Sequence, residues 1–290
     1  MKRPSTYTSA AGFRQALEAR LANIARDEAM DIQRLRRQVA FDRLLCRVFH
    51  APGLPWALKG GYAMELRLHT TRTTKDIDLS WRGSLKATSK KDVAAALRER
   101  LQEVAGEDLN DHFVFLIGEP IMDIDAAPYG GGRFPVEARM AGRVFARFHI
   151  DAGVGDAIID PLEEIEARDW LGFAAIPARS FPSIGREQQF AEKLHAYTLP
   201  RKGTANTRVR DLVDMVLLIK MGLDEARTRE AIAATFNRRG THDLPENLSP
   251  PPADWARLYE TLAEECRLSM TLAQAFQAVK QFANTLVRQD

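Results

Sequence analysis

The sequence predicts an α+β fold, with a mixed sheet and flanking helices in the first part of the chain and a helical lobe in the last part. Short segments with apolar residues at every second position alternate with segments of helical periodicity as far as about residue 165. After Pro182 the apolar residues recur every three or four positions, which is the spacing of amphipathic helices. We therefore expect an N-terminal helical segment over residues 1–50, a core over 51–165 and a C-terminal helical lobe over 166–290.

The elements of the first part follow from local periodicity. Apolar residues recur at helical spacing over residues 11–50, until Ala51-Pro-Gly-Leu-Pro55 ends the pattern. The expected elements are then a strand over 56–58, a turn at 59–61, a helix over 62–68, a strand over 76–81, a helix over 89–105 and strands over 112–117, 134–141 and 143–151.

The last part of the chain has helical periodicity almost throughout. Its one long break is the proline-rich loop over residues 247–252. We expect helices over 186–199, 208–220, 224–237, 253–266 and 271–288.

The composition is that of a globular protein. Of 290 residues, 45% are hydrophobic and 28% are charged, and the net charge of +2 favours no class of partner by itself. No apolar run reaches the roughly 18–20 residues of a membrane helix, and the first residues lack the apolar stretch of a secretory signal. Cys46 and Cys266 are too few for a disulfide framework or a cysteine zinc site. We therefore expect a cytoplasmic protein with no membrane partner.

Basic residues gather in three segments. Such clusters suit nucleotide phosphates or a nucleic-acid backbone, but they are equally common as solvated helix faces or in local ion pairs. The clusters are Arg34, Arg36, Arg37, Arg43 and Arg47; Arg133, Arg139, Arg143 and Arg147; and Arg201, Lys202, Arg208 and Arg210.

The strongest candidate site combines a glycine pair with two carboxylates. Gly60 and Gly61 stand where a strand meets a helix, so the backbone can approach a phosphate and the helix start offers free N–H donors. Asp76 and Asp78 stand two apart on the next strand, so both carboxylates point to one face. Paired carboxylates that face phosphates are typical magnesium ligands. Either motif alone is common, but together at this separation they predict a metal and phosphate site.

A third carboxylate would strengthen the metal site. Asp151 ends an alternating strand on its polar face and is our candidate for metal support or general-base work, although it could also cap the turn at Gly153. Asp123 and Asp125 form a second Asp-Ile-Asp, but no glycine pair precedes it, so we interpret it as a loop feature. We expect His149 and His195 to be structural.

Several blocks of sequence, taken in order, point to one family. They are Leu58–Gly61, Arg72–Leu79, Phe134–Arg143, Phe148–Asp156, Gln189–His195 and Arg208–Asp214. Over residues 12–220 the chain resembles the AbiEii/AbiGii (MenT-like) nucleotidyltransferase toxins of the DNA polymerase β-like superfamily. The resemblance implies a polymerase β-like lobe with a mixed sheet, followed by a helical lobe.

The resemblance also implies roles for residues of the helical lobe. The family's Gln-x-x-x-Lys element falls on Gln189 and Lys193, and the matching lysine contacts the nucleotide phosphates. The family's last aspartate falls on Asp211, an essential active-site carboxylate. Read from the residues alone, Lys193 would be a solvated lysine and Asp211 a member of an ion pair. One departure is Gly61, where the wider superfamily usually has serine.

These observations predict a magnesium-dependent nucleotidyltransferase toxin. Asp76, Asp78 and Asp151 would hold one or two Mg²⁺ ions, and Asp151 or Asp211 would help to deprotonate an attacking hydroxyl. The resemblance makes the tRNA 3′ end the leading acceptor and implies growth arrest and a cognate antitoxin. The NTP phosphates are expected to lie near Lys59, Gly60, Gly61, Arg72, Thr74 and Lys193.

Three other functions stay open at this point. The chain could transfer a nucleotide to a protein or a small molecule, cleave RNA with the same carboxylates, or bind nucleotide or RNA without catalysis. Dinucleotide binding and a P-loop are disfavoured, because neither G-x-G-x-x-G after a strand nor Gly-Lys-Ser/Thr occurs.

Overall fold

The computed structural model describes residues 7–51, 53–68, 73–85, 87, 89–124, 127–201 and 203–287. The chain divides into two compact units. The first consists of Met1–Arg67, Thr73–Gly155 and Glu163–Ser183, and the second of Leu68–Arg72, Asp156–Leu162 and Ile184–Asp290.

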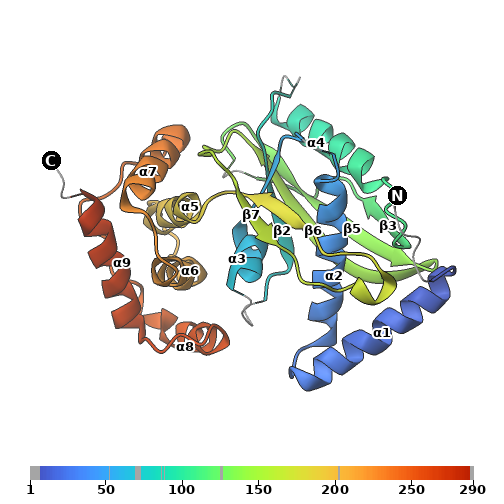
Figure 1. Ribbon diagram of the computed structural model, residues 1–290. Helices are drawn as coiled ribbons and strands as arrows, with labels where there is room; N and C mark the ends of the chain where they lie inside the picture. The colour runs from blue at the N-terminus through green and yellow to red at the C-terminus, as the bar shows by residue number, and fades with distance from the viewer. Residues whose placement is uncertain are drawn as a thin grey trace. The chain divides into compact units, whose positions relative to one another are not determined.

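A mixed sheet of eight strands forms the centre of the first unit in the described part of the chain (Figure 1). The strands are β1 (Trp56–Lys59), β2 (Asp76–Trp81), β3 (Phe113–Ile117), β4 (Met122–Asp123), β5 (Gly131–Met140), β6 (Arg143–Val154), β7 (Glu163–Glu166) and β8 (Ser180–Ser183). They follow the order β3-β5-β6-β2-β1-β8-β7, with β4 paired to β5. β2 runs parallel to β6 and antiparallel to β1, so the sheet is mixed at its centre.

Helices pack on one face of this sheet. They are α1 (Ala10–Asp27), α2 (Ile32–Val48), α3 (Gly60–Leu68) and α4 (Lys90–Ala105), with a short 3₁₀ turn η1 (Gly172–Ala174). α2 contacts β6, and α4 contacts β3 and β5. The rings of Phe41 on α2 and Phe148 on β6 meet edge to face, 4.7 Å apart at their centroids. Buried strand residues such as Ile77, Leu79 and Ile150 form the core beneath these helices.

Residues 11–50, which we predicted as one helical stretch, form two helices. Ala29 adopts a left-handed φ of 53° between them, and the side chain of Asp31 accepts a hydrogen bond of 2.7 Å from the Arg34 backbone N–H to begin α2. The turn allows α2 to pack against the sheet while α1 adds Phe13 and Leu17 to the same core.

α2 carries buried ion pairs in addition to apolar residues. Arg43 and Arg47 both bind Asp111, at 2.7 Å, and all three side chains are at least nine-tenths buried. Arg34 pairs with Glu65 of α3. The first arginine cluster therefore serves mainly to join α2 to the elements around it.

β7 and β8 were not predicted from the sequence. β8 pairs in parallel with β1, with Leu58 opposite Ser183, and the Ser183 hydroxyl donates a hydrogen bond of 2.9 Å to the Leu58 carbonyl. This pairing supports β1 immediately before the glycine pair.

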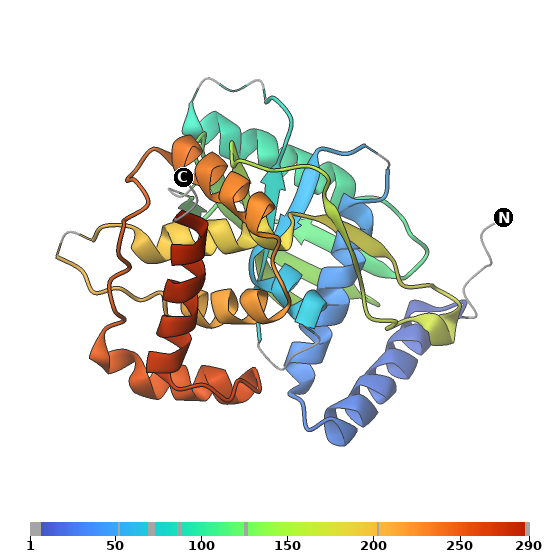
Figure 2. The same cartoon turned by 60° about the vertical axis from the view of Figure 1, so that its left-hand side comes forward.

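The second unit is helical over its described residues. It contains α5 (Arg186–Thr198), α6 (Val209–Lys220), α7 (Glu225–Arg239), η2 (Ala253–Trp255), α8 (Ala256–Glu265) and α9 (Leu272–Val287). α5 packs against α6 and α7, and α6 packs against α9. α9 lies across α5 and α6 (Figure 2), and there Phe282 meets Phe190 edge to face. The five helices predicted after Pro182 are confirmed to within a few residues at their ends.

Within the described residues, no helix has both the length and the apolar character required to cross a bilayer.

Candidate active site

The turn from β1 to α3 brings the backbone close to a carboxylate of β2. Gly60 has a left-handed φ of 67°, and a Cβ added there would overlap the Asp78 carboxylate. The Gly61 N–H donates to Asp78 Oδ2 at 3.2 Å. Only glycine at position 60 allows both the turn and this approach. The turn therefore places the first N–H groups of α3 beside Asp78.

Three carboxylates share the exposed face of adjacent strands. Asp76 and Asp78 alternate with the buried residues Ile77 and Leu79 on β2. In the parallel pairing of β2 with β6, Asp78 lies opposite Asp151. The β2–β6 register thus places the three carboxylates that we predicted as metal ligands on one face of the sheet.

Arg133 of β5 lies among these carboxylates. Its Nε and Nη2 donate to the two oxygens of Asp151 at 2.8 and 2.7 Å, and Nη2 also donates to Asp76 Oδ2 at 3.2 Å. The hydrogen bond to Asp151 raises the pKa of the Arg133 guanidinium well above its ordinary value, although burial acts in the opposite direction. A planar guanidinium that binds a carboxylate with two bonds is a strong and directional pair. Sequence reasoning counted Arg133 only as a member of a basic cluster.

Other predicted residues surround the carboxylates. His149 Nδ1 lies 3.3 Å from Asp76 Oδ1. The Thr74 hydroxyl donates to the backbone oxygen of Asp76 at 3.3 Å, so it anchors the start of β2. Lys59 lies opposite Asp78 in the β1–β2 register and therefore shares its face of the sheet. Arg72, predicted as a phosphate contact, lies outside the described residues.

The donor chemistry of the site suits magnesium. Carboxylate oxygens on one face are the ligands that a hard divalent cation prefers. Among the described residues, however, no group of three or more His, Cys, Asp or Glu side chains is drawn together closely enough to hold an ion. The Arg133 guanidinium instead binds both Asp76 and Asp151.

The helical unit holds a second charged cluster. Lys193 of α5 pairs with Asp211 at 3.2 Å and with Asp214 at 2.5 Å, both on α6. The Lys193 side chain is only 11% exposed, so it is not the solvated lysine that its sequence position alone would suggest. Asp211 also pairs with Arg208. Asp214 is fully buried, and its part in this cluster was not predicted from the sequence.

His195, predicted as structural, is buried in the helical unit. Its Nε2 lies 2.9 Å from the Thr241 hydroxyl, and its ring packs on Phe236. Burial, with smaller effects from Arg239 and His242, lowers the pKa of His195 to about 4. This environment keeps the imidazole neutral.

Asp123 does not join the three carboxylates. It lies exposed on β4, opposite Gly132 of β5. Its partner in the second Asp-Ile-Asp, Asp125, lies outside the described residues.

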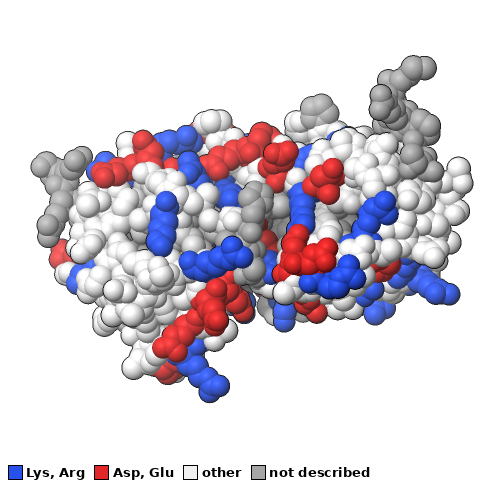
Figure 3. Space-filling model, turned by 60° about the horizontal axis from the view of Figure 1, so that its bottom comes forward, with Lys and Arg blue, Asp and Glu red and all other residues white. Residues whose placement is uncertain are grey.

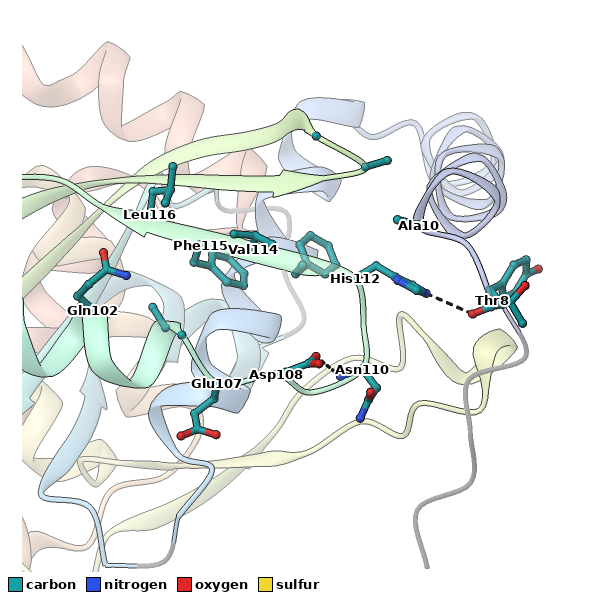
Figure 4. Close-up of a pocket in the computed structure, with 16 residues that line it drawn as sticks. Thr8, Ala10, Gln102, Glu107, Asp108, Asn110, His112, Val114, Phe115 and Leu116 are labelled. Carbon is teal, nitrogen blue, oxygen red and sulfur yellow. Dashed lines mark hydrogen bonds between the residues drawn. The ribbon is translucent and has the colours of Figure 1, made fainter.

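A hollow of about 1090 Å³ runs along β3, away from the carboxylates (Figure 4). His112 Nε2 lies there 3.2 Å from the Tyr7 carbonyl, and Val114 is 58% exposed. The described residues that line it include Glu107 and Asp108 but no lysine or arginine. Such a lining does not suit a polyphosphate, so its size does not make it the active site.

Acidic and basic side chains are intermixed on the face of the protein that Figure 3 displays. Many arginines of the sequence clusters are indeed paired: Arg36 with Glu18, and both Arg139 and Arg147 with Glu137. Clustering in the sequence therefore does not by itself identify a nucleic-acid surface.

Comparison with known proteins identifies the family of the chain. The model of the family described as "Nucleotidyl transferase AbiEii toxin, Type IV TA system" matches residues 43–282. No curated protein matches the chain significantly.

Three solved structures match the chain at low sequence identity. The chain is similar to MenT4, the nucleotidyltransferase toxin Rv2826c from Mycobacterium tuberculosis H37Rv, with a TM-score of 0.62 and 16% identity over 94% of this chain and 90% of that one. It also matches JHP933 from Helicobacter pylori, with a TM-score of 0.46 and 13% identity over 86% of this chain and 90% of that one. A putative nucleotidyltransferase from H. pylori matches with a TM-score of 0.43 and 12% identity over 89% of this chain and 96% of that one.

Proposed function

The chain belongs to the AbiEii nucleotidyltransferase toxin family of type IV toxin–antitoxin systems, and we propose that it transfers a nucleoside monophosphate from an NTP to the 3′ end of tRNA. The observation that supports this proposal best is the shared face of Asp76, Asp78 and Asp151 beside the Gly60–Gly61 turn. One side of that face offers N–H donors to phosphates, and the other offers carboxylates.

The donor triphosphate lies over the start of α3. Backbone N–H groups at a helix N-terminus and the positive end of the helix dipole favour phosphate there. Lys59 and Arg72 add positive charge to the bound phosphates, and the resemblance to the family assigns the same role to Lys193. Thr74 contributes through the start of β2, which it anchors.

Asp76, Asp78 and Asp151 would hold magnesium, which supplies charge neutralisation of the triphosphate when it is bound. For these side chains to converge on an ion, Arg133 has to release at least one of its two carboxylates. The freed guanidinium is then placed to meet the negative charge of a substrate phosphate.

In the transfer, a hydroxyl oxygen of the acceptor forms a bond to the α-phosphorus as the bond from that phosphorus to the bridging oxygen of pyrophosphate breaks. Asp151, with Asp211 as the second candidate, takes the hydroxyl proton. Positioning and charge stabilisation supply most of the rate in such displacements.

A labelled-transfer assay tests the proposal. The protein is incubated with Mg²⁺, each α-labelled NTP in turn and total tRNA, and the products are separated on a gel. We expect label in the tRNA band, and we expect Asp76→Asn to reduce it roughly 100-fold or more.

Asp123→Asn is the matched control, because it removes a carboxylate from the second Asp-Ile-Asp on exposed β4 and should leave transfer unchanged. Label in a protein band instead of the tRNA band would show that the chain transfers a nucleotide to a protein and not to tRNA. Shortened RNA without use of NTP would indicate a nuclease. Binding of NTP or RNA with no turnover would indicate a regulator.

In the cell, the proposed transfer would block translation and arrest growth. Membership of a toxin–antitoxin family implies a cognate antitoxin. We propose that the antitoxin is encoded beside this chain and that both act in the cytoplasm.

A further inference from the structure

An open groove of about 880 Å³ on the first unit has Asp76 and its partner Arg133 in its lining. β2 begins at Asp76, opposite His149. Because the two strands are parallel, residues 143–148 of β6 extend past the N-terminal end of β2. The groove lies along this extension. Its lining residues include Arg37 of α2, Lys75 before β2, Asp76, and Pro135 and Leu116 from the neighbouring strands.

The lining has a surplus of positive charge. It includes the four basic residues Arg37, Lys75, Arg133 and Arg147, against the two acidic residues Asp76 and Glu137. Leu116, whose side chain is 46% exposed, and Pro135 add an apolar wall. Cations beside an apolar surface suit a nucleic-acid strand, since phosphates and bases each find a partner.

Arg37 differs from the other arginines of α2. Arg34, Arg36, Arg43 and Arg47 each pair with a carboxylate. Within the described residues, the Arg37 side chain makes neither a hydrogen bond nor an ion pair, and its Nε is buried without a partner. A buried donor of a charged group that lacks a partner costs folding free energy, which a bound anion would recover.

The order of the strands indicates whether the groove binds the donor NTP or the acceptor. The Gly60–Gly61 turn follows β1 on one side of β2, whereas β6 and β5 lie on the other side. In an in-line displacement the attacking and leaving oxygens lie on opposite sides of the phosphorus. With the leaving pyrophosphate over the glycine pair, the attacking hydroxyl has to come from the side of β6, where the groove lies.

From this placement we infer that the groove is the acceptor subsite, in which Arg37 and Lys75 bind backbone phosphates of an RNA strand whose terminal hydroxyl reaches the carboxylates. This inference rests on the proposed function. A site of about 300–1,000 Å³ holds a ligand of a few hundred daltons, so the groove accommodates one or two nucleotides and not a duplex.

Binding measurements without turnover test the inference. A 5′-fluorescein-labelled single-stranded RNA with the sequence of a tRNA 3′ end is titrated with protein in the absence of NTP, at several salt concentrations. We expect Arg37→Ala to weaken RNA binding roughly tenfold and to reduce the slope of log K against log salt by about 0.7, the loss of one phosphate contact. Arg37→Lys should retain most of the affinity, and Lys75→Ala should act in the same direction.

Calorimetry with each of the four NTPs supplies the second readout. We expect Arg37→Ala to leave NTP affinity unchanged, and Arg26→Ala, an exposed arginine of α1, to leave both affinities unchanged. Thermal unfolding verifies that each variant is folded.

The outcomes separate the two proposals. If the wild-type protein transfers label to tRNA but Arg37→Ala binds RNA as well as the wild type does, the acceptor groove is wrong and the proposed function stands. Equal losses of NTP and RNA affinity would assign the groove to the donor and likewise overturn the inference. If the wild-type protein transfers no label to tRNA, the proposed function fails independently of the groove.

Discussion

Arg133 compensates the negative charge of three carboxylates that the sheet forces onto one face. Carboxylates that carry the same charge on neighbouring strands repel one another, and this repulsion would destabilise the sheet without a cation nearby. The guanidinium binds Asp151 with two hydrogen bonds and reaches Asp76 with a third contact. In the proposed mechanism a divalent cation takes over part of this compensation.

Removing the guanidinium should therefore make the fold depend more strongly on Mg²⁺. We expect Arg133→Gln to lower the midpoint of thermal unfolding in the absence of divalent cations, because the carboxylates lose their partner. Addition of Mg²⁺ should then raise the midpoint more in the variant than in the wild-type protein, since the ion stabilises the form to which it binds.

Asp76→Asn in the Arg133→Gln background serves as the control, because it removes one ligand and should reduce the Mg²⁺-induced rise. Equal rises in the wild-type protein and in Arg133→Gln would argue against a magnesium site at these carboxylates.

Gly60 is a second position where one residue determines the site. Its left-handed backbone costs a residue with a Cβ about 1–2 kcal/mol, and here the Cβ would also displace the Asp78 carboxylate. We expect Gly60→Ala to lower the free energy of unfolding and to abolish transfer, as measured by denaturant unfolding and the labelled assay.

Gly142 provides a matched comparison. It also has a left-handed φ, of 72°, but a Cβ there would meet no atom within 4 Å. Gly142→Ala should lower the free energy of unfolding only by the cost of the left-handed backbone, and it should retain transfer activity. If the two variants had the same activity, the close approach of Gly60 to Asp78 would not matter for the reaction.

Among the elements, α5 connects the stability of the helical unit to pH through His195. The ordinary pKa of histidine is about 6.5, whereas folding lowers the pKa of His195 to about 4. The unfolded chain therefore binds a proton that the folded chain does not between these values, and stability should fall as pH decreases from about 6.5 to about 4. His195→Gln should flatten this part of the pH dependence of unfolding. If the free energy of unfolding varied equally with pH in the wild-type protein and in His195→Gln, the lowered pKa of His195 in the folded chain would be contradicted.

The elements with clear periodicity could be predicted from the sequence. The strand over 76–81 and the helices after Pro182 were predicted because their apolar residues follow one period for their whole length. β7 and β8 were missed for physical reasons. β7 reads Glu-Glu-Ile-Glu, which has one apolar residue, and β8 contains Pro182, which cannot donate to a strand ladder.

The contacts within the site could be predicted only in part. The spacing of Asp76 and Asp78 is enough to place both on one face, because a strand alternates. The contact between Arg133 and Asp151 depends on the register of β5 against β6, and no pattern in one sequence specifies that register. The burial of Asp214 beside Lys193 likewise depends on how α5 packs against α6.

For the molecule as a whole, the family and the α+β fold predicted from the sequence are confirmed by the family model over residues 43–282 and by the likeness to MenT4. The sheet unit carries the glycine pair and three carboxylates, and the helical unit carries the Lys193 cluster. The proposal that Lys193 and Asp211 also take part in the transfer rests on the resemblance to the family.

The central claim is that the α-phosphate of an NTP moves to tRNA at the Asp76 and Asp78 carboxylates. The most direct measurement compares tRNA labelling from an NTP carrying its label on the α-phosphate with labelling from the same NTP labelled on the γ-phosphate, for the wild-type protein, Asp76→Asn and Asp123→Asn. The account predicts label from the α position alone, lost in Asp76→Asn and retained in Asp123→Asn. Label from the γ position, or α-label that persists in Asp76→Asn, would contradict it.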